Sequence, residues 1–223
     1  WTPKPAYEGD DIAVVDRSVD PDQDELTYAW TISGPGGFSQ TGTAPQFLLK
    51  GKDTENRPGT YRIRLSVRDE FGASDAVERD VVVHELGIQG MVGHTEDWER
   101  NRLRYNEKYP DSERPSDWFW AGEAFVLTAD VTDTGSSATK PVAVEARAPH
   151  QLMKALVPGT TNFVRWQGML RSSDAGYPLD ELPQGPLTFT FTVSYSNGVV
   201  KTSQVTVTIR NTVNSFVQVH RVQ

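Results

Sequence analysis

The alternation of apolar and polar residues predicts β-strands along most of the chain. Residues 61–67 alternate in this way, with the period of two that marks a strand with one buried face. Turn-forming residues at 69–72 separate this strand from a second one that ends at 81–83, and this arrangement is typical of a β-hairpin. Two further strands are predicted upstream, at residues 12–15 and 26–32.

A different pattern begins after the first hairpin. Residues 84–93 break the alternation and predict a junction between two domains. Residues 95–108 also lack a period of two, and they predict an α-helix with Thr95 as its N-cap, acidic residues in its first turn and Lys108 in its last. Pro110 is expected to end this helix.

Strand patterns resume after the predicted helix. They occur at residues 124–131, 142–146 and 162–170, and in a final pair of long strands joined by Asn197 and Gly198. An Asn-Gly pair between two alternating strands is a strong signal for a β-hairpin. Each half of the chain therefore ends on a long antiparallel hairpin.

These elements predict an all-β fold with two domains. The first domain is expected over residues 1–86 and the second over residues 87–223, with the helix near 95–108 as an insertion in the second. Two stretches of antiparallel strands, each ending on a hairpin, are typical of immunoglobulin-like β-sandwiches. We therefore predict two tandem immunoglobulin-like β-sandwich domains.

The composition narrows the range of functions. Hydrophobic residues make up 37% of the 223 residues, enough for one or two cores, and the net charge of −8 disfavours binding to nucleic acid or to anionic membranes. The absence of cysteine excludes disulfides, thiolate zinc sites and cysteine nucleophiles. No apolar run has the roughly 20 residues needed to cross a bilayer, so membrane insertion is not expected.

A chain that opens at Trp1 without a signal peptide is expected to be a piece of a longer parent. The lack of thiols favours an extracellular or cell-surface location on a bacterium.

Several short segments of residues 7–85 follow one another in a recognisable order. They are Asp-Arg-Ser at 16–18, Asp-Pro-Asp-Gln-Asp at 20–24, Tyr-Ala-Trp at 28–30, and the alternating strand of 61–69 followed by Gly72. On these residues, 7–85 resemble the PKD family of immunoglobulin-like domains, which are accessory modules of bacterial secreted proteins and of cell-surface receptors. The family often has Trp-Asp-Phe-Gly-Asp-Gly where this chain has Trp-Thr-Ile-Ser-Gly-Pro at 30–35. The remainder of the chain resembles only a generic immunoglobulin-like β-sandwich.

Four aspartates that lie within nine positions predict a structural calcium site. Asp16, Asp20, Asp22 and Asp24 offer the hard oxygen ligands that calcium prefers, and Asp69 at the end of a strand could complete the set. The spacing is not that of an EF-hand, because the positions that need Gly and Glu carry other residues. The resemblance also implies calcium, since some PKD domains bind it through matching aspartates. The alternative is a solvated acidic loop at one end of the sandwich.

Aromatic residues gather in and after the predicted helix. They are Trp98, Tyr105, Tyr109, Trp118 and Trp120. Exposed rings of this kind stack on sugars or anchor protein interfaces, so Trp98, Trp118 and Trp120 are candidate ligand-binding residues for a protein or a polysaccharide. The alternative is that these rings pack between the helix and the sheet.

No catalytic motif is present, and His94 and His150 stand isolated in the sequence. We therefore expect no enzymatic activity. The sequence favours a structural spacer or an adhesion or binding module of a secreted or surface-anchored bacterial protein, joined to other domains of a longer parent chain. The alternative is a carbohydrate-binding accessory module of a larger secreted hydrolase.

Overall fold

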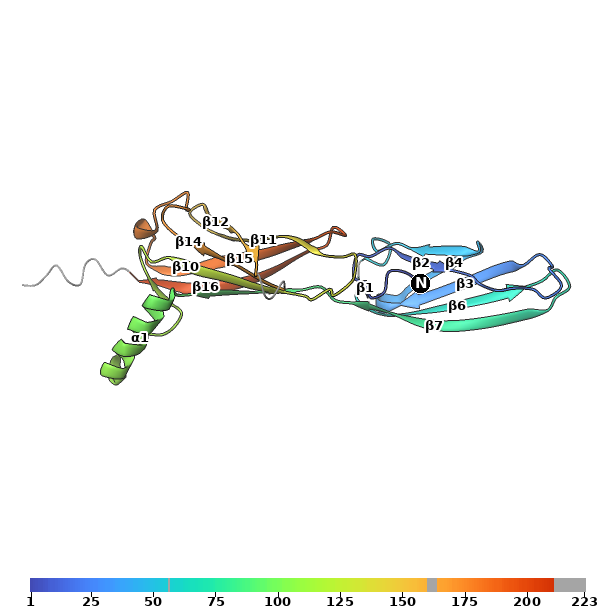
Figure 1. The fold of residues 1–223 in the computed structure, drawn as a ribbon, viewed down its shortest axis with the longest axis horizontal. Helices are drawn as coiled ribbons and strands as arrows, with labels where there is room; N and C mark the ends of the chain where they lie inside the picture. Colours follow the sequence, from blue (N-terminus) through green and yellow to red (C-terminus); the bar gives the residue numbers. More distant parts are fainter. Residues whose placement is uncertain (56, 160–163, 211–223) are drawn as a thin grey trace, which may run out of the picture. The chain divides into compact units, whose positions relative to one another are not determined.

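A computed structural model describes residues 1–55, 57–159 and 164–210 of the chain (Figure 1). The protein is all-β and its sheets form two immunoglobulin-like sandwiches, which confirms the predicted fold class. Contacts divide the chain into two compact units. The first unit holds Trp1–Leu86 and two short segments from further along the chain, Thr134–Lys140 and Tyr195–Val199, and the second unit begins at Gly87.

The first unit contains a five-stranded sheet and a two-stranded sheet. The strands follow one another in the larger sheet as β1-β7-β6-β3-β4, and β2 pairs with β5 in the smaller one. All of these pairs are antiparallel except β1 with β7. The bounds are β1 Ala6–Tyr7, β2 Ile12–Val15, β3 Thr27–Gly34, β4 Phe38–Gly42, β5 Gln46–Leu49, β6 Gly59–Arg68 and β7 Ser74–His84, with a short 3-10 helix at Pro35–Gly37.

Alternate residues of these strands form the core of the first unit. In β6, Tyr61, Ile63 and Leu65 are buried while the residues between them are exposed, as the period of two predicts. Trp30 lies opposite Leu65 in the register of β3 and β6, and its ring packs near Phe47 with centroids 6.4 Å apart. The hydrophobic pattern of the sequence thus builds a core between the two sheets.

The second unit has a four-stranded sheet, β13-β14-β10-β8, and a five-stranded sheet, β12-β11-β15-β16-β9. Strand β9 runs parallel to β16. The elements are β8 Ile88–Gly93, α1 Glu96–Lys108, β9 Trp118–Trp120, β10 Phe125–Val131, β11 Pro141–Ala148, β12 Leu152–Ala155, β13 Val157–Pro158, β14 Arg165–Leu170, β15 Gly185–Tyr195 and β16 Val200–Arg210, with 3-10 helices at Pro110–Ser112 and Leu179–Glu181.

Phenylalanines dominate the core of the second unit. Phe119, Phe125, Phe189 and Phe191 are fully buried. The ring of Phe125 lies 5.1 Å from that of Phe119 and 5.1 Å from that of Phe189, centroid to centroid. These rings connect β9, β10 and β15, so the middle residue of β9 is anchored in the core and its two neighbours face the other way.

The predicted helix is confirmed as α1, which projects from the second sandwich (Figure 1). Thr95 is the N-cap, and its hydroxyl accepts a hydrogen bond from the backbone N–H of Trp98 at 3.4 Å. No residue of α1 is fully buried, so the helix lies against its surroundings through half-buried side chains alone. None of the helices in the described part of the chain has the length and apolar character needed to cross a membrane.

The boundary between the two units, at Leu86 and Gly87, lies within the junction predicted at 84–93, but most of that segment is a strand. Residues 88–93 form β8, which pairs with β10 as an integral strand of the second sandwich. The strand escapes detection because Gly90 occupies its buried position, where a large apolar residue would be expected. A Cβ at Gly90 would lie 2.2 Å from the Phe191 ring, so the ring fills the place of the missing side chain.

Most other predicted strands are confirmed, including the final hairpin across Asn197 and Gly198. The strand predicted at 162–170 is described from Arg165 onward, and residues 162 and 163 lie outside the described residues. The strands that the sequence pattern does not reveal are mostly short. They are β1, β4, β5, β9, β12 and β13, of two to five residues each.

Candidate functional site

Three of the five predicted calcium ligands come together in the first unit. One carboxylate oxygen each of Asp20, Asp24 and Asp69 lies within 4.8 Å of the others, and all three residues are half-buried. Two ligands that each sit about 2.3–2.6 Å from a calcium ion are at most about 5 Å apart, so this spacing fits one ion. In the described part of the chain, no cationic side chain forms an ion pair with these three carboxylates.

Hydrogen bonds to the backbone fix two of the three carboxylates. Oδ1 of Asp20 accepts from the N–H groups of Asp22 and Asp24, at 2.8 and 3.2 Å. Oδ1 of Asp69 accepts from Gly72 and Ala73, at 2.6 and 2.8 Å. Each of these carboxylates keeps its second oxygen for another ligand, and calcium would need further oxygens to reach six to eight.

The other two predicted ligands do not join this cluster. Asp16 accepts hydrogen bonds from the backbone N–H and the hydroxyl of Ser18, at 2.9 and 2.6 Å. Asp22 is exposed in the turn that Asp20 closes. The structure therefore reduces the candidate ligand set to Asp20, Asp24 and Asp69.

Two residues of the predicted aromatic group, Trp98 and Trp120, line a pocket in the second unit. The pocket has a volume of about 410 Å³. The indole rings of Trp98 and Trp120 lie 6.3 Å apart, with 32° between their planes. The lining residues are Trp98, Arg114, Trp120, Ala121, Gly122 and Glu123.

Trp118 does not line this pocket, although it shares a face of β9 with Trp120. The guanidinium of Arg210 covers its ring, with Cζ 4.0 Å from the ring centroid. Tyr105 and Tyr109 form a pair of rings 4.8 Å apart at the end of α1. Of the three candidate ligand-binding tryptophans, the structure thus brings two to one cavity and leaves the third against an arginine.

A tight turn after β9 places an acid at the inner wall of the pocket. The N–H of Glu123 donates to the Trp120 carbonyl at 3.0 Å, and Gly122 within this turn has φ of +88°, which favours glycine. The turn brings Oε2 of Glu123 to the Trp120 N–H at 3.1 Å. Glu123 is buried, so its carboxylate needs partners inside the protein.

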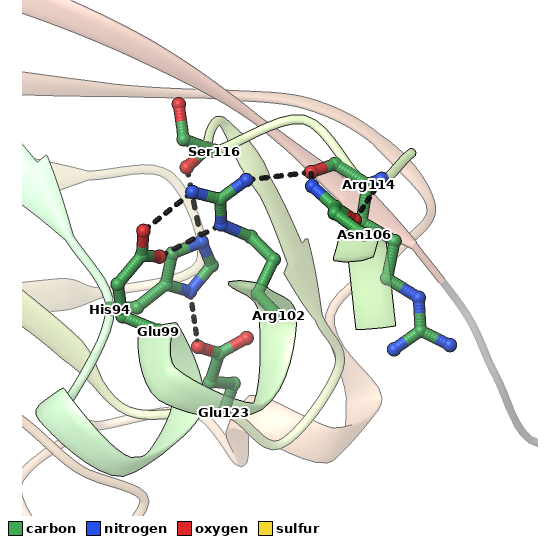
Figure 2. Close-up of polar contacts among 7 residues, drawn as sticks. All are labelled: His94, Glu99, Arg102, Asn106, Arg114, Ser116 and Glu123. Carbon is green, nitrogen blue, oxygen red and sulfur yellow. Dashed lines mark hydrogen bonds and ion pairs between the residues drawn. The ribbon is translucent and has the colours of Figure 1, made fainter. Parts of the chain in front are cut away.

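The main partner of Glu123 is His94, which the sequence analysis described as isolated. Nδ1 of His94 lies 2.5 Å from Oε1 of Glu123, and both side chains are almost completely buried (Figure 2). Nε2 of His94 lies 3.0 Å from the carbonyl oxygen of Ser116, to which it donates. The carboxylate of Glu123 thus has a polar partner inside the protein, and both ring nitrogens of His94 face an oxygen. The interpretation of His94 as isolated is therefore wrong. The sequence does not reveal the contact, because Glu123 is 29 positions away from His94 in the chain.

The His94 ring also packs face to face with its neighbours. Its centroid lies 4.1 Å from that of Phe119 and 5.9 Å from that of Trp98, with small angles between the planes. His94 thus joins the phenylalanine core to the pocket wall.

A second polar network holds the segment after α1 against the helix. Figure 2 shows the Arg102 guanidinium between the carboxylate of Glu99 and the carbonyl of Arg114, with Nη1 donating to that carbonyl at 2.8 Å. The side-chain hydrogen bonds from Arg102 hold the pKa of Glu99 below its ordinary value and raise the pKa of Arg102. Because the folded pKa of Glu99 is lowered, this pair stabilises the fold above the ordinary Glu pKa and is lost as the pH falls through the folded value.

Comparisons with known proteins give structural matches of low TM-score and no family. A scan against models of protein families finds no match, and a search of curated proteins finds none either. The resemblance of residues 7–85 to PKD domains thus stays a prediction. Solved structures similar to the chain include a bacterial ice-binding adhesin, with 11% sequence identity and a TM-score of 0.37. A second is a tetra-tandem repeat from the extending region of a large adhesion protein, with 14% identity and a TM-score of 0.33. A third is a Bacteroides ovatus protein of a mixed-linkage glucan utilization locus in complex with a heptasaccharide, with 12% identity and a TM-score of 0.28.

Each of these alignments covers 92% of the chain but only part of the other protein, at 59%, 46% and 42% of its length, respectively. Function is therefore argued from the residues of this chain alone.

Proposed function

We propose that the chain is a non-catalytic adhesion or binding module of a secreted or surface-anchored bacterial protein, with its ligand site in the second sandwich. The pocket between Trp98 and Trp120 carries this proposal, because it presents two indole rings beside a buried polar wall. Aromatic rings of this kind dominate the energetics of protein interfaces and ligand sites. The first sandwich serves as a spacer.

The pocket residues support binding better than catalysis. Both oxygens of Glu123 are engaged, one by His94 and one by the Trp120 N–H. His94 has oxygen acceptors at both ring nitrogens, so it has no free nitrogen to serve as a general base. No serine, threonine or lysine that could act as a nucleophile lines the pocket in the described part of the chain.

The second candidate function is a carbohydrate-binding accessory module of a larger secreted hydrolase. The same two indole rings favour it, since a sugar ring stacks on an aromatic face. The two candidate functions use the same site, and they differ in the kind of parent protein to which the chain would belong.

Alanine substitutions of the three tryptophans test the proposed site. We expect Trp98→Ala and Trp120→Ala to weaken binding to an immobilised polysaccharide or protein ligand at least tenfold, because their rings line the pocket. Trp118→Ala is the matched control, since Arg210 covers its ring. Binding is measured by surface plasmon resonance, with a melting curve for each variant. Equal losses for all three variants, in parallel with lower melting temperatures, would contradict the assignment of the pocket as the ligand site.

We also propose that calcium stabilises the first unit through Asp20, Asp24 and Asp69. Calcium at a hundred times its dissociation constant adds about 2.7 kcal/mol, which raises the melting midpoint of a domain of this size by roughly 10–20 °C. Scanning calorimetry of the full chain in millimolar calcium and in chelator measures the difference.

Substitutions in the acidic cluster provide the control for this calcium effect. Asp24→Asn together with Asp69→Asn is expected to abolish most of it, whereas Asp16→Asn together with Asp22→Asn should keep it. Magnesium should substitute poorly because it demands tighter octahedral geometry. Identical melting curves in calcium and chelator at matched ionic strength would leave the aspartates as a solvated acidic loop.

A further inference from the structure

Arg114 is held rigidly at the edge of the aromatic pocket. Its N–H donates to Oδ1 of Asn106 at 2.8 Å, and its carbonyl accepts from Arg102 and from Asn106, at 2.8 and 3.1 Å (Figure 2). Its side chain extends away from this network in Figure 2. Backbone contacts with α1 thus fix the residue and leave its charged end outside the network.

Two aromatic rings form cation–π contacts with the Arg114 guanidinium. Its Cζ lies 3.7 Å from the ring centroid of Tyr105 and 5.3 Å from that of Trp120. A guanidinium held against aromatic rings by cation–π contacts can still donate from its N–H groups. The edges of the guanidinium are the part that binds a carboxylate with two parallel hydrogen bonds.

No acidic partner meets these edges in the described part of the chain. The nearby arginines on α1 are paired, Arg100 with Glu96 and Asp97, and Arg102 with Glu99. Neither an ion pair nor a side-chain hydrogen bond involves the guanidinium of Arg114 among the described residues. In a chain of net charge −8, a restrained and unpaired guanidinium in a pocket is a site for an anionic group.

The acid within the pocket does not neutralise Arg114. Both oxygens of Glu123 are engaged by other groups, one by His94 and one by the Trp120 N–H, and neither forms an ion pair with Arg114. Two further acids lie near the pocket without an ion pair to Arg114: Glu113, its neighbour in the chain, and the exposed Asp180, whose Cβ lies 3.6 Å from the position of a Cβ on Gly122. The guanidinium of Arg114 therefore remains available to pair with an anionic group of a bound ligand.

We propose that this pocket binds a sugar that carries a carboxylate, the chemical class of the uronic acids. The indole rings of Trp98 and Trp120 receive the apolar face of the sugar ring, and Arg114 binds its carboxylate through the guanidinium edge. A sugar fits better than an acidic peptide because it combines a flat apolar face with a carboxylate at a fixed position on the same ring. This inference rests on the proposed role of the second sandwich in ligand binding.

The test compares binding of the full chain to polygalacturonate, to the same polymer after chemical reduction of its carboxylates, and to polyglutamate. We expect binding to polygalacturonate, at least a tenfold loss on carboxyl reduction, and weaker binding as salt increases. Arg114→Gln should cause at least a tenfold loss for polygalacturonate and little change for the reduced polymer. Arg104→Gln, at an exposed helical arginine outside the pocket, should leave the affinity unchanged. Asp180→Asn, which removes a repulsive carboxylate from the rim, should maintain or raise it.

Each contrary result overturns a definite part of the proposal. Equal affinity for the native and reduced polymers, lost in Trp120→Ala, would keep the pocket as a sugar site and reject the carboxylate. Stronger binding to polyglutamate would identify an acidic peptide as the ligand. The absence of binding to all three polymers would reject the uronic acid assignment, while the tryptophan variants with other ligands would still test the proposed function.

Discussion

Replacing Trp30 by alanine is expected to lower the stability of the first sandwich by about 3–5 kcal/mol, the range for removing a large aromatic side chain from a core. Trp30 is 4% exposed, and its Nε1–H donates to the carbonyl of Ala44 at 2.8 Å. The substitution removes the packing with Phe47 and the hydrogen bond to the Ala44 carbonyl. Urea unfolding of the full chain, followed by circular dichroism, measures the loss.

Phe71→Ala is the matched control for Trp30→Ala. Phe71 is an aromatic residue of the same unit, but it is 79% exposed in the turn between β6 and β7. Its replacement is expected to change the free energy of unfolding by less than about 0.5 kcal/mol, as is usual for surface positions. Similar effects of the two substitutions would show that Trp30 does not belong to the core.

The elements that the sequence predicts well are those with a local physical cause. The strand at residues 61–67 follows from the alternation of its own side chains, and the helix follows from a Thr95 cap with an acidic first turn. The hairpin at the end of the chain follows from Asn197 and Gly198. Each signal lies within a few residues of the element that it specifies.

The elements that the sequence does not reveal depend on residues far along the chain. Strand β8 has Gly90 at its buried position, and this position is filled by Phe191, about a hundred residues later. Strand β9 has three residues, and it is defined by parallel pairing with β16. A periodicity search cannot detect either strand, because the missing information lies in the partner.

The residues of the candidate site likewise divide into those that the sequence identifies and those whose role depends on distant parts of the chain. The aromatic residues and the aspartates stand out by type, so the sequence finds Trp98, Trp120 and Asp20. It cannot separate Trp118 from Trp120, because only the fold places Arg210 over the former. The role of Arg114 likewise depends on Tyr105 and Trp120, which reach it from different elements.

The second large effect is expected from Glu123→Ala, which should lower the stability of the second sandwich by about 3–5 kcal/mol, as in other cases where one member of a buried pair is removed. The Glu123 side chain is 1% exposed and that of His94 is 3% exposed. Without Glu123, a buried imidazole nitrogen and the Trp120 N–H both lose their acceptor. Urea unfolding followed by circular dichroism measures the loss, with Glu107→Ala at an exposed position of α1 as the control.

Further variants separate the interaction from a general effect of truncation. Glu123→Gln keeps the size of the side chain and an acceptor for the Trp120 N–H, so its cost should be smaller than that of Glu123→Ala. Combining Glu123→Ala with His94→Phe removes both polar partners, and Phe suits the stacking on Phe119. The double variant should then be more stable than the sum of the single effects predicts, because no buried imidazole remains unpaired. Strictly additive losses would show that His94 and Glu123 do not interact in the folded protein, and the buried pair would have to be abandoned as the support of the pocket wall.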